Sequence, residues 1–292
     1  MPIAIFTDTA ANLPAHLVKE NNITVIPLTY IVDGEPHTCA DAAEFDGAEF
    51  YQAIRNGAEV KTSQITPQIY IDYMTPALER GEDILFIGLS SGVSGSFSSA
   101  RIALAELEEK FPERRIKLVD SLGASLGEGI LVLRAIECVK HRMSMDDTVD
   151  RIISLRRRMY QIITVDDLMH LKRGGRVTGV TAVVGTMLAI KPLLKGNEHG
   201  KIVMLDKVRG RRRSIEALAE KYFSLVEYPK NQIVGIAQAD CPEDAEYLRS
   251  LIVKKYPPKD VIIVPFEPVT GSHVGPGALA LFFEGDNDVR GK

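Results

Sequence analysis

A loop rich in glycine and serine follows the apolar run Ile84–Ile87 and could hold an anion. The run predicts a buried strand, the residues Leu-Ser-Ser-Gly-Val-Ser-Gly at 89–95 predict a turn, and a helical pattern begins at Ser96. Small residues let the backbone curl tightly, so that N–H groups and hydroxyls converge where the next helix presents its positive end. The sequence therefore predicts a seat for a carboxylate or a phosphate.

A second group of hydroxyl residues precedes another expected helix. Thr66 is suited to be the N-cap and Pro67 the first helical residue, so capping explains Thr66. Capping does not explain Thr62 and Ser63, whose side chains could donate to an anion. Ordinary turn hydrogen bonding would explain these two residues equally well.

Two later segments carry groups that could pair with the same anion. The segment 171–176, Leu-Lys-Arg-Gly-Gly-Arg, predicts a tight turn that displays Arg173 or Arg176, and a guanidinium pairs well with phosphate or carboxylate. A solvated basic turn is the alternative. His273 lies in the glycine-rich segment 271–277, an unusual setting for a core histidine, and its imidazole could hold a carboxylate.

The first loop also contains the G-x-S-x-G pattern of α/β-hydrolases, with Ser90 as the nucleophile. Asp240 or Asp260, followed by His273, would supply the chain order of a catalytic triad. In a nucleophile elbow the serine leads directly into a helix, whereas Gly92–Gly95 intervene here. A serine hydrolase acting on lipid or ester substrates is kept as an alternative.

A third glycine-rich turn, with Gly123, Gly127 and Gly129, resembles a nucleotide-binding turn. Neither G-x-G-x-x-G nor G-x-x-x-x-G-K-[ST] occurs in the chain, so redox cofactors and the usual phosphate loops lack support. Close packing at the start of a helix explains the glycines better. A small-molecule transferase that binds a nucleotide is kept as a further alternative.

Strands and helices alternate through the first half of the chain. Such alternation predicts right-handed crossovers and a parallel sheet, with ligands bound beyond the carboxyl ends of its strands. Asp8, Ser90 and Asp120 all lie at such ends. The expected strands are Ile3–Phe6, Ile23–Ile26, Ile84–Ile87 and Ile116–Val119, and the expected helices are Phe45–Arg55, Ile69–Arg80, Ser96–Lys110 and Gly127–His141.

A second α/β unit is expected after a charged helix near residues 145–158. Its expected strands lie at 160–165, 201–205, 233–237 and 261–264, which gives an N-terminal domain of residues 1–158 and a C-terminal domain of residues 159–292. The uncharged stretch Val177–Ile190 is shorter than the roughly 20 residues of a membrane span. It predicts a buried helix that packs on another helix or forms the wall of a ligand tunnel.

The overall composition is that of an ordinary globular protein. The chain has 292 residues and a net charge of −4, which argues against a dedicated nucleic-acid binder; the basic runs at 156–158 and 209–213 are interpreted as solvated helix faces. Cys39, Cys138 and Cys241 are too far apart for a disulfide framework or a C-x-x-C metal site. With no signal peptide expected at the N-terminus, these features favour a cytoplasmic protein.

Taken together, six of these segments resemble the DegV family of fatty-acid-binding proteins, over nearly the whole chain. The resemblance implies two α/β domains that bury one long-chain fatty acid between them. It also implies a carrier without catalytic activity or cofactor, which presents the carboxyl group to the catalytic subunit of a separate ATP-dependent fatty acid kinase. Transient membrane contact would fit this role, and a lipid-gated interaction protein is the remaining alternative. The segments are residues 6–14, 61–64, 88–96, 120–121, 171–177 and 273–278.

The resemblance also implies roles for individual residues. Thr62 and Ser94 correspond to the threonine and serine that hold the carboxylate, with His273 nearby; Ser63 and Gly95 stand beside them in the same two motifs and complete the expected carboxylate site. Arg173 corresponds to the arginine associated with engaging the kinase. The segments 7–10, Thr-Asp-Thr-Ala, and 64–67, Gln-Ile-Thr-Pro, depart from the commoner patterns T-D-S-T and Q-P-S-P without removing an assigned hydroxyl. Chain length and saturation of the lipid do not follow from these motifs.

Overall fold

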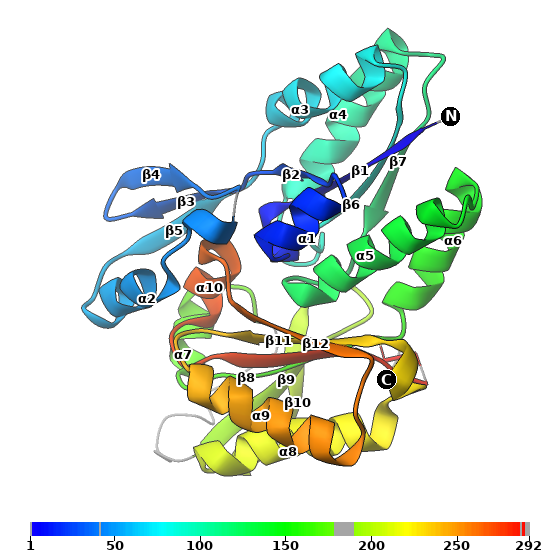
Figure 1. Cartoon of the computed structure of the whole chain (residues 1–292). Helices are drawn as coiled ribbons and strands as arrows, with labels where there is room; N and C mark the ends of the chain where they lie inside the picture. Colours follow the sequence, from blue (N-terminus) through cyan, green and yellow to red (C-terminus); the bar gives the residue numbers. More distant parts are fainter. Residues whose placement is uncertain (1, 41, 178–189, 287, 290–292) are drawn as a thin grey trace.

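A four-stranded parallel sheet forms the first half of the chain (Figure 1). The computed structural model describes residues 2–40, 42–177, 190–286 and 288–289. The central strand β6 is buried along its whole length, which is why the sequence shows an unbroken apolar run there. The strands run in the order β2 (Thr24–Ile26), β1 (Ile3–Asp8), β6 (Asp83–Gly88) and β7 (Ile116–Asp120).

Helices cover both faces of this sheet, as the alternating pattern predicted. Helices α3 (Pro67–Glu79) and α4 (Ser96–Lys110) pack on one face, and α5 (Leu126–Lys140) and α6 (Met145–Arg156) on the other. Thr66 caps α3 by accepting from the N–H of Ile69, as expected for this residue. The parallel-sheet prediction is therefore confirmed, with helix ends close to those expected.

A small antiparallel sheet, which the sequence analysis missed, projects from this half of the chain. It is ordered β4 (Glu35–Thr38), β3 (Thr29–Val32) and β5 (Val60–Ser63), and α2 (Gly47–Arg55) lies in the connection between β4 and β5. The four residues of β4 are all exposed, so no apolar alternation marks the strand. Strand β5 carries Thr62 and Ser63, two of the residues predicted to hold a carboxylate.

The second half of the chain forms a six-stranded mixed sheet. Its neighbouring strands are antiparallel except for β11 and β12. The helices α8 (Arg211–Leu225) and α9 (Pro242–Lys255) cover its outer face, while α5 packs on its inner face. The order is β10 (Ile202–Arg209), β9 (Ile190–Gly196), β8 (Met159–Thr164), β13 (Leu279–Glu284), β11 (Ile233–Gln238) and β12 (Asp260–Pro265).

The two sheets share α5, which contacts strands of both and lies between them in Figure 1. A buried core surrounds α5, a second core separates the first sheet from α3 and α4, and a third separates the second sheet from α8 and α9. The result is five stacked layers, with helices and sheets in alternation. The remaining elements are α1 (Ala15–Glu20), α7 (Leu168–Arg173), α10 (Pro268–Val274) and the 3-10 helices at Thr9–Ala11, Ala42–Glu44 and Pro229–Asn231.

Two expectations from the sequence are not confirmed by the structure. The predicted buried helix at Val177–Ile190 falls mostly on residues 178–189, which lie outside the described part of the chain; Ile190 itself begins strand β9. All strands of the parallel sheet precede residue 158 and all strands of the mixed sheet follow it. Because α10 packs against α2 and β5 of the first half, the division at residue 158 stays a proposal.

Two surface features complete the description. The basic run at 209–213 lies at the start of α8, where Arg212 and Arg213 pair with Glu216 on the same helix, as expected of a solvated helix face. Among the described helices, none combines the length and the apolar character needed to cross a membrane.

Candidate functional site

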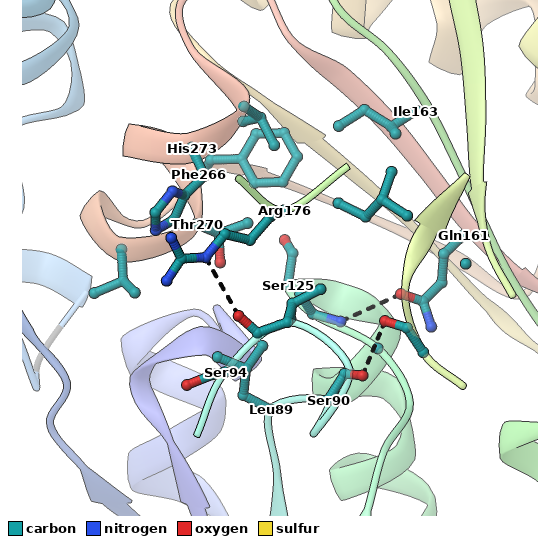
Figure 2. Close-up of a pocket in the computed structure, with 18 of the residues that line it drawn as sticks. Leu89, Ser90, Ser94, Ser125, Gln161, Ile163, Arg176, Phe266, Thr270 and His273 are labelled. Atoms are coloured by element: carbon teal, nitrogen blue, oxygen red, sulfur yellow. Dashed lines mark hydrogen bonds between the residues drawn. The ribbon is translucent and has the colours of Figure 1, made fainter. Parts of the chain in front are cut away.

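A cavity of about 330 Å³ lies between the loops of the first sheet and the inner face of the second (Figure 2). This volume lies at the small end of the roughly 300–1,000 Å³ common for ligand pockets. The loops after β6 and β7 form one wall, and strands β8 and β13 form the opposite wall. Twelve of the 27 described lining residues are apolar: Leu28, Leu89, Val93, Leu122, Ala124, Ile163, Ile202, Phe266, Val269, Val274, Ala280 and Phe282.

One end of the cavity is polar because β5 and α10 meet there. The hydroxyl Oγ1 of Thr62 on β5 lies 2.9 Å from Nε2 of His273 on α10, in hydrogen-bonding contact. Burial, reinforced by the charge of Arg176, lowers the pKa of His273 to about 4. The imidazole is therefore neutral near pH 7, with one ring nitrogen to donate and one to accept.

Helix α10 is fixed in place by its cap and by α2. The carboxylate of Glu267 accepts from the N–H groups of Val269 and Thr270, which satisfies the first turn of the helix. Tyr51 of α2 donates its hydroxyl to the carbonyl of Phe266 at 2.7 Å, and this hydroxyl occupies the space where a Cβ on Gly271 would stand. Glycine at 271 therefore permits the close approach that positions His273.

The turn after α7 packs directly on His273. A Cβ on Gly174 would lie 2.9 Å from the ring nitrogen Nδ1 of His273, so glycine is required for this contact. His170 of α7 is bonded through Nε2 to the carbonyl of Ser272 at 2.6 Å, which ties α7 to α10. His170 thus has a structural role in holding this end of the cavity together.

The two arginines of the same turn differ in position. Arg176 lines the cavity and donates to the carbonyls of Val93 at 3.3 Å and Gly174 at 2.7 Å (Figure 2). Arg173 is exposed and lies 3.4 Å from the carboxylate of Asp167. The sequence left open which arginine would meet an anion in the cavity, and the structure places Arg176 there.

The glycine and serine loop brings Ser94 to the polar end. Its Oγ accepts from the N–H of Ser96 at 3.2 Å and lies 3.0 Å from the hydroxyl of Ser96, which in turn accepts from the N–H of Ile65. Gly95 leaves room for the side chain of Gln64, which lies directly against it. The loop and the Thr62 segment are therefore held as one unit, and the Ser94 hydroxyl can donate into the cavity.

The prediction that backbone N–H groups of this loop bind an anion is wrong for the first part of the loop. The N–H of Ser91 donates to the carboxylate of Asp120, and the N–H groups of the next three residues donate to Ser90. These amides are already used within the loop, so side chains rather than a nest of amides meet a ligand there.

Two aspartates at the strand ends organise these loops. Asp8 is almost fully buried and accepts from the N–H groups of Ala10 and Leu89, each at 2.9 Å. Burial raises the pKa of Asp8 to about 6, and the two amides partly offset this rise. Asp120 accepts from the N–H groups of Ser91 and Leu122. Asp8 and Asp120 therefore organise the loops and are not among the residues that line this cavity.

All five predicted carboxylate-site residues line this one cavity: Thr62, Ser63, Ser94, Gly95 and His273. The sequence analysis missed Ser125, Gln161 and Thr270, which also line it. Gln161 and Ile163 are the half-buried residues of β8, between buried neighbours, so they share the face that lines the cavity.

The triad of a serine hydrolase is not assembled. Ser90 is 1% exposed and donates to the carbonyl of Gly200 at 3.0 Å, while His273 pairs with Thr62. Asp240 forms an ion pair with Arg55. Among the described residues, no cluster of three or more histidine, cysteine or acidic side chains is arranged to hold a metal ion.

Comparison with known proteins agrees with this architecture. The sequence model of the DegV family, described as a family of uncharacterised proteins, matches residues 2–286, and the chain belongs to this family. A DegV domain-containing protein of Clostridium perfringens is 37% identical over 282 residues, covering 97% of each chain.

Two solved structures share the fold. One is a DegV family protein from Thermus thermophilus whose structure was described for its fatty acid binding. It is 28% identical to this chain with a TM-score of 0.89, and the match covers 98% of this chain and 100% of the other. The Streptococcus pneumoniae fatty acid kinase B3 protein, loaded with linoleic acid, is 22% identical with a TM-score of 0.83, covering 98% and 100%. The two-sheet architecture described above is therefore that of DegV proteins.

Proposed function

We propose that this chain binds a long-chain fatty acid in the cavity and presents its carboxyl group to a separate ATP-dependent fatty acid kinase. The observation that carries the proposal is one cavity in which an apolar lining adjoins a cluster of hydrogen-bonding side chains at the His273 end. Thr62, Ser94 and His273 meet at that end, with Arg176 as the nearby cation. The related Thermus thermophilus protein, described by its fatty acid binding, supports the same ligand class.

The energetics suit a carrier. Burying about 15 methylene groups stabilises the complex by up to roughly 12 kcal/mol, which keeps the lipid out of water until a partner arrives. A carboxylate drawn into this setting needs donors to replace its lost hydration. The hydroxyls of Thr62 and Ser94 supply them, while the neutral imidazole of His273 orients Thr62 and Arg176 supplies the positive charge.

The chemical step would belong to the kinase. A carboxylate oxygen attacks the γ-phosphorus of ATP, the bond to the β-phosphate oxygen breaks, and ADP leaves with that electron pair to give an acyl phosphate. This chain would hold the attacking oxygen without catalysing the reaction itself, in the cytoplasm. The name of the Streptococcus pneumoniae protein motivates the kinase as partner, and exposed Arg173 is the residue we assign to that contact.

Native mass spectrometry of the purified protein, followed by denaturation and extraction, tests the lipid. One fatty acid per chain is expected. A protein that is empty and takes up no added fatty acid would exclude the proposal and leave the lipid hydrolase or transferase to be assayed.

A second experiment tests the kinase contact. The Arg173→Ala protein should keep its lipid but give at least ten-fold less acyl phosphate with ATP and a bacterial fatty acid kinase. Arg142→Ala, an exposed arginine after α5, is the matched control. Normal phosphorylation by Arg173→Ala would remove Arg173 from the kinase contact, and lipid binding without phosphorylation by any kinase would favour a lipid-gated interaction protein.

A further inference from the structure

Gln161 lines the cavity on the side away from His273 (Figure 2). The residue lies on strand β8 of the second sheet, opposite Phe282 on β13. Its side-chain carbonyl Oε1 accepts from the N–H of Ala124, in the loop after β7 of the first sheet, at 3.2 Å. This side chain thus links a strand of the second sheet to a loop of the first sheet, at the side of the cavity away from His273.

Two glycines make room for this bridge. A Cβ on Gly123 would collide with the amide nitrogen of Gln161, and a Cβ on Gly127 would collide with its carboxamide carbon. Neither glycine has a positive φ, so backbone conformation does not require glycine at either place. The glycine pattern that resembles a nucleotide-binding turn is explained here by the space that the Gln161 side chain occupies.

The amide also leaves a donor unpaired. Nε2 of Gln161 is buried and has no hydrogen-bond partner among the described residues. A methionine or leucine would fill similar space without this cost, so the amide is not the most stabilising choice for the core. The hydrogen bond to Ala124 nevertheless fixes the position of the side chain, which suits a rigid end wall.

We propose that Gln161 is the specificity-determining residue that limits how long an acyl chain the cavity accepts. This inference rests on the proposed function, because it takes the carboxyl group to lie at the Thr62 and His273 end. With the head fixed there, the methyl end of the chain meets the Gln161 side chain. Acyl chains too long to fit between the Thr62 and His273 end and Gln161 are excluded by contact with this side chain, which its hydrogen bond to Ala124 holds in place.

The test compares lipids bound by four proteins: the native chain, Gln161→Ala, Gln161→Met and Gly123→Ala. Extracted lipids are identified by mass spectrometry, and affinities are measured for saturated fatty acids of increasing length. Gln161→Ala should accept longer chains, with affinity rising about four-fold for each methylene that enters the enlarged cavity. Gln161→Met, which fills similar space, should keep the native length limit.

Gly123→Ala provides the opposite change. Its new methyl group displaces the Gln161 amide toward the open cavity, so the preferred chains should become shorter. If Gln161→Ala fails to fold, the Gly123→Ala variant still tests whether Gln161 limits the length of the acyl chain. Native length preference in either folded variant would overturn the inference while leaving fatty-acid binding intact. Absence of any bound or added fatty acid in the native protein would instead overturn the proposed function.

Discussion

The two sheets contribute to the cavity in different ways. The parallel sheet contributes loops at the carboxyl ends of its strands, and these loops carry hydroxyls and glycines such as Ser94 and Gly95. The mixed sheet contributes one flat face, whose alternate residues Ile163, Ala280 and Phe282 form an apolar surface. The loops therefore provide hydrogen-bonding groups at defined positions of the cavity, whereas the sheet face provides apolar contact surface.

The difference predicts how each half responds to mutation. A flat apolar face stabilises through contact area and packing, so shortening one of its side chains should cost several kcal/mol of folding free energy. A loop residue acts through one or two hydrogen bonds, whose loss costs less but affects the ligand specifically. Variants of the apolar face should therefore change stability and lipid choice together, whereas variants of loop hydroxyls that line the cavity should change mainly binding.

The largest effect is expected for Phe282→Ala on the cavity face of β13. Phe282 is 3% exposed, and its removal should lower the free energy of unfolding by about 3–5 kcal/mol, measured by urea denaturation. Its neighbour Phe283 points to the opposite face, where it stacks on Tyr160, and provides the matched control. Both variants should lose stability, but only Phe282→Ala should change which lipids bind. Equal lipid profiles for the two variants would contradict the assignment of this face to the ligand.

Asp8→Ala tests the loops of the parallel sheet. The change leaves the N–H groups of Ala10 and Leu89 buried without an acceptor, so the free energy of unfolding should fall by roughly 3 kcal/mol. Asp120→Ala is the control, because water can replace this partly exposed carboxylate, and it should cost about 1 kcal/mol. Equal losses of unfolding free energy in the two variants would show that the burial of Asp8 does not determine how much it contributes to stability.

The sequence predicted the parallel half of the fold better than the mixed half, for a physical reason. Strand β6 is buried on both faces and gives an unbroken apolar run, and Thr66 with Pro67 marks a helix start by local chemistry. Pairing in the antiparallel sheets depends on partners distant in the chain: β8 pairs with β13, more than a hundred residues later. Nothing local to Glu35–Thr38 distinguishes β4 from a loop.

The same distinction holds for the cavity. Hydroxyl and glycine motifs drew attention to Thr62, Ser94 and His273, because their composition is unusual for a core. Gln161 gave no such signal, since a lone glutamine in a strand is unremarkable until the opposite wall is known. Motifs identify loop residues, whereas the residues of a sheet face become visible only when the sheet is assembled.

The pH dependence of folding stability tests the burial of His273 at the polar end of the cavity. Its pKa is lowered to about 4 from the ordinary 6.5, so the unfolded chain binds a proton below pH 6.5 that the folded protein does not. Stability contributed by the neutral imidazole is thus present above pH 6.5 and lost as the pH falls toward 4. Between pH 7 and pH 5 the native protein should lose about 2 kcal/mol relative to His273→Gln, measured by denaturation at each pH. Parallel curves for the two proteins would show that His273 is not buried as described.

The smallest effect is expected for Ser94→Ala, which removes a single hydroxyl from the polar end. The N–H of Ser96 loses its acceptor, which should cost about 1 kcal/mol of folding free energy, but the hydroxyl of Ser96 still accepts from the N–H of Ile65 and keeps the loop attached to β5. The affinity for a fatty acid should fall about five-fold, the equivalent of about 1 kcal/mol for one lost hydrogen bond. Ser98→Ala, on the exposed side of α4, should change nothing. Displacement of a fluorescent fatty acid measures both variants, and an unchanged affinity for Ser94→Ala would mean that the loops position the carboxylate through Thr62 and Arg176 alone.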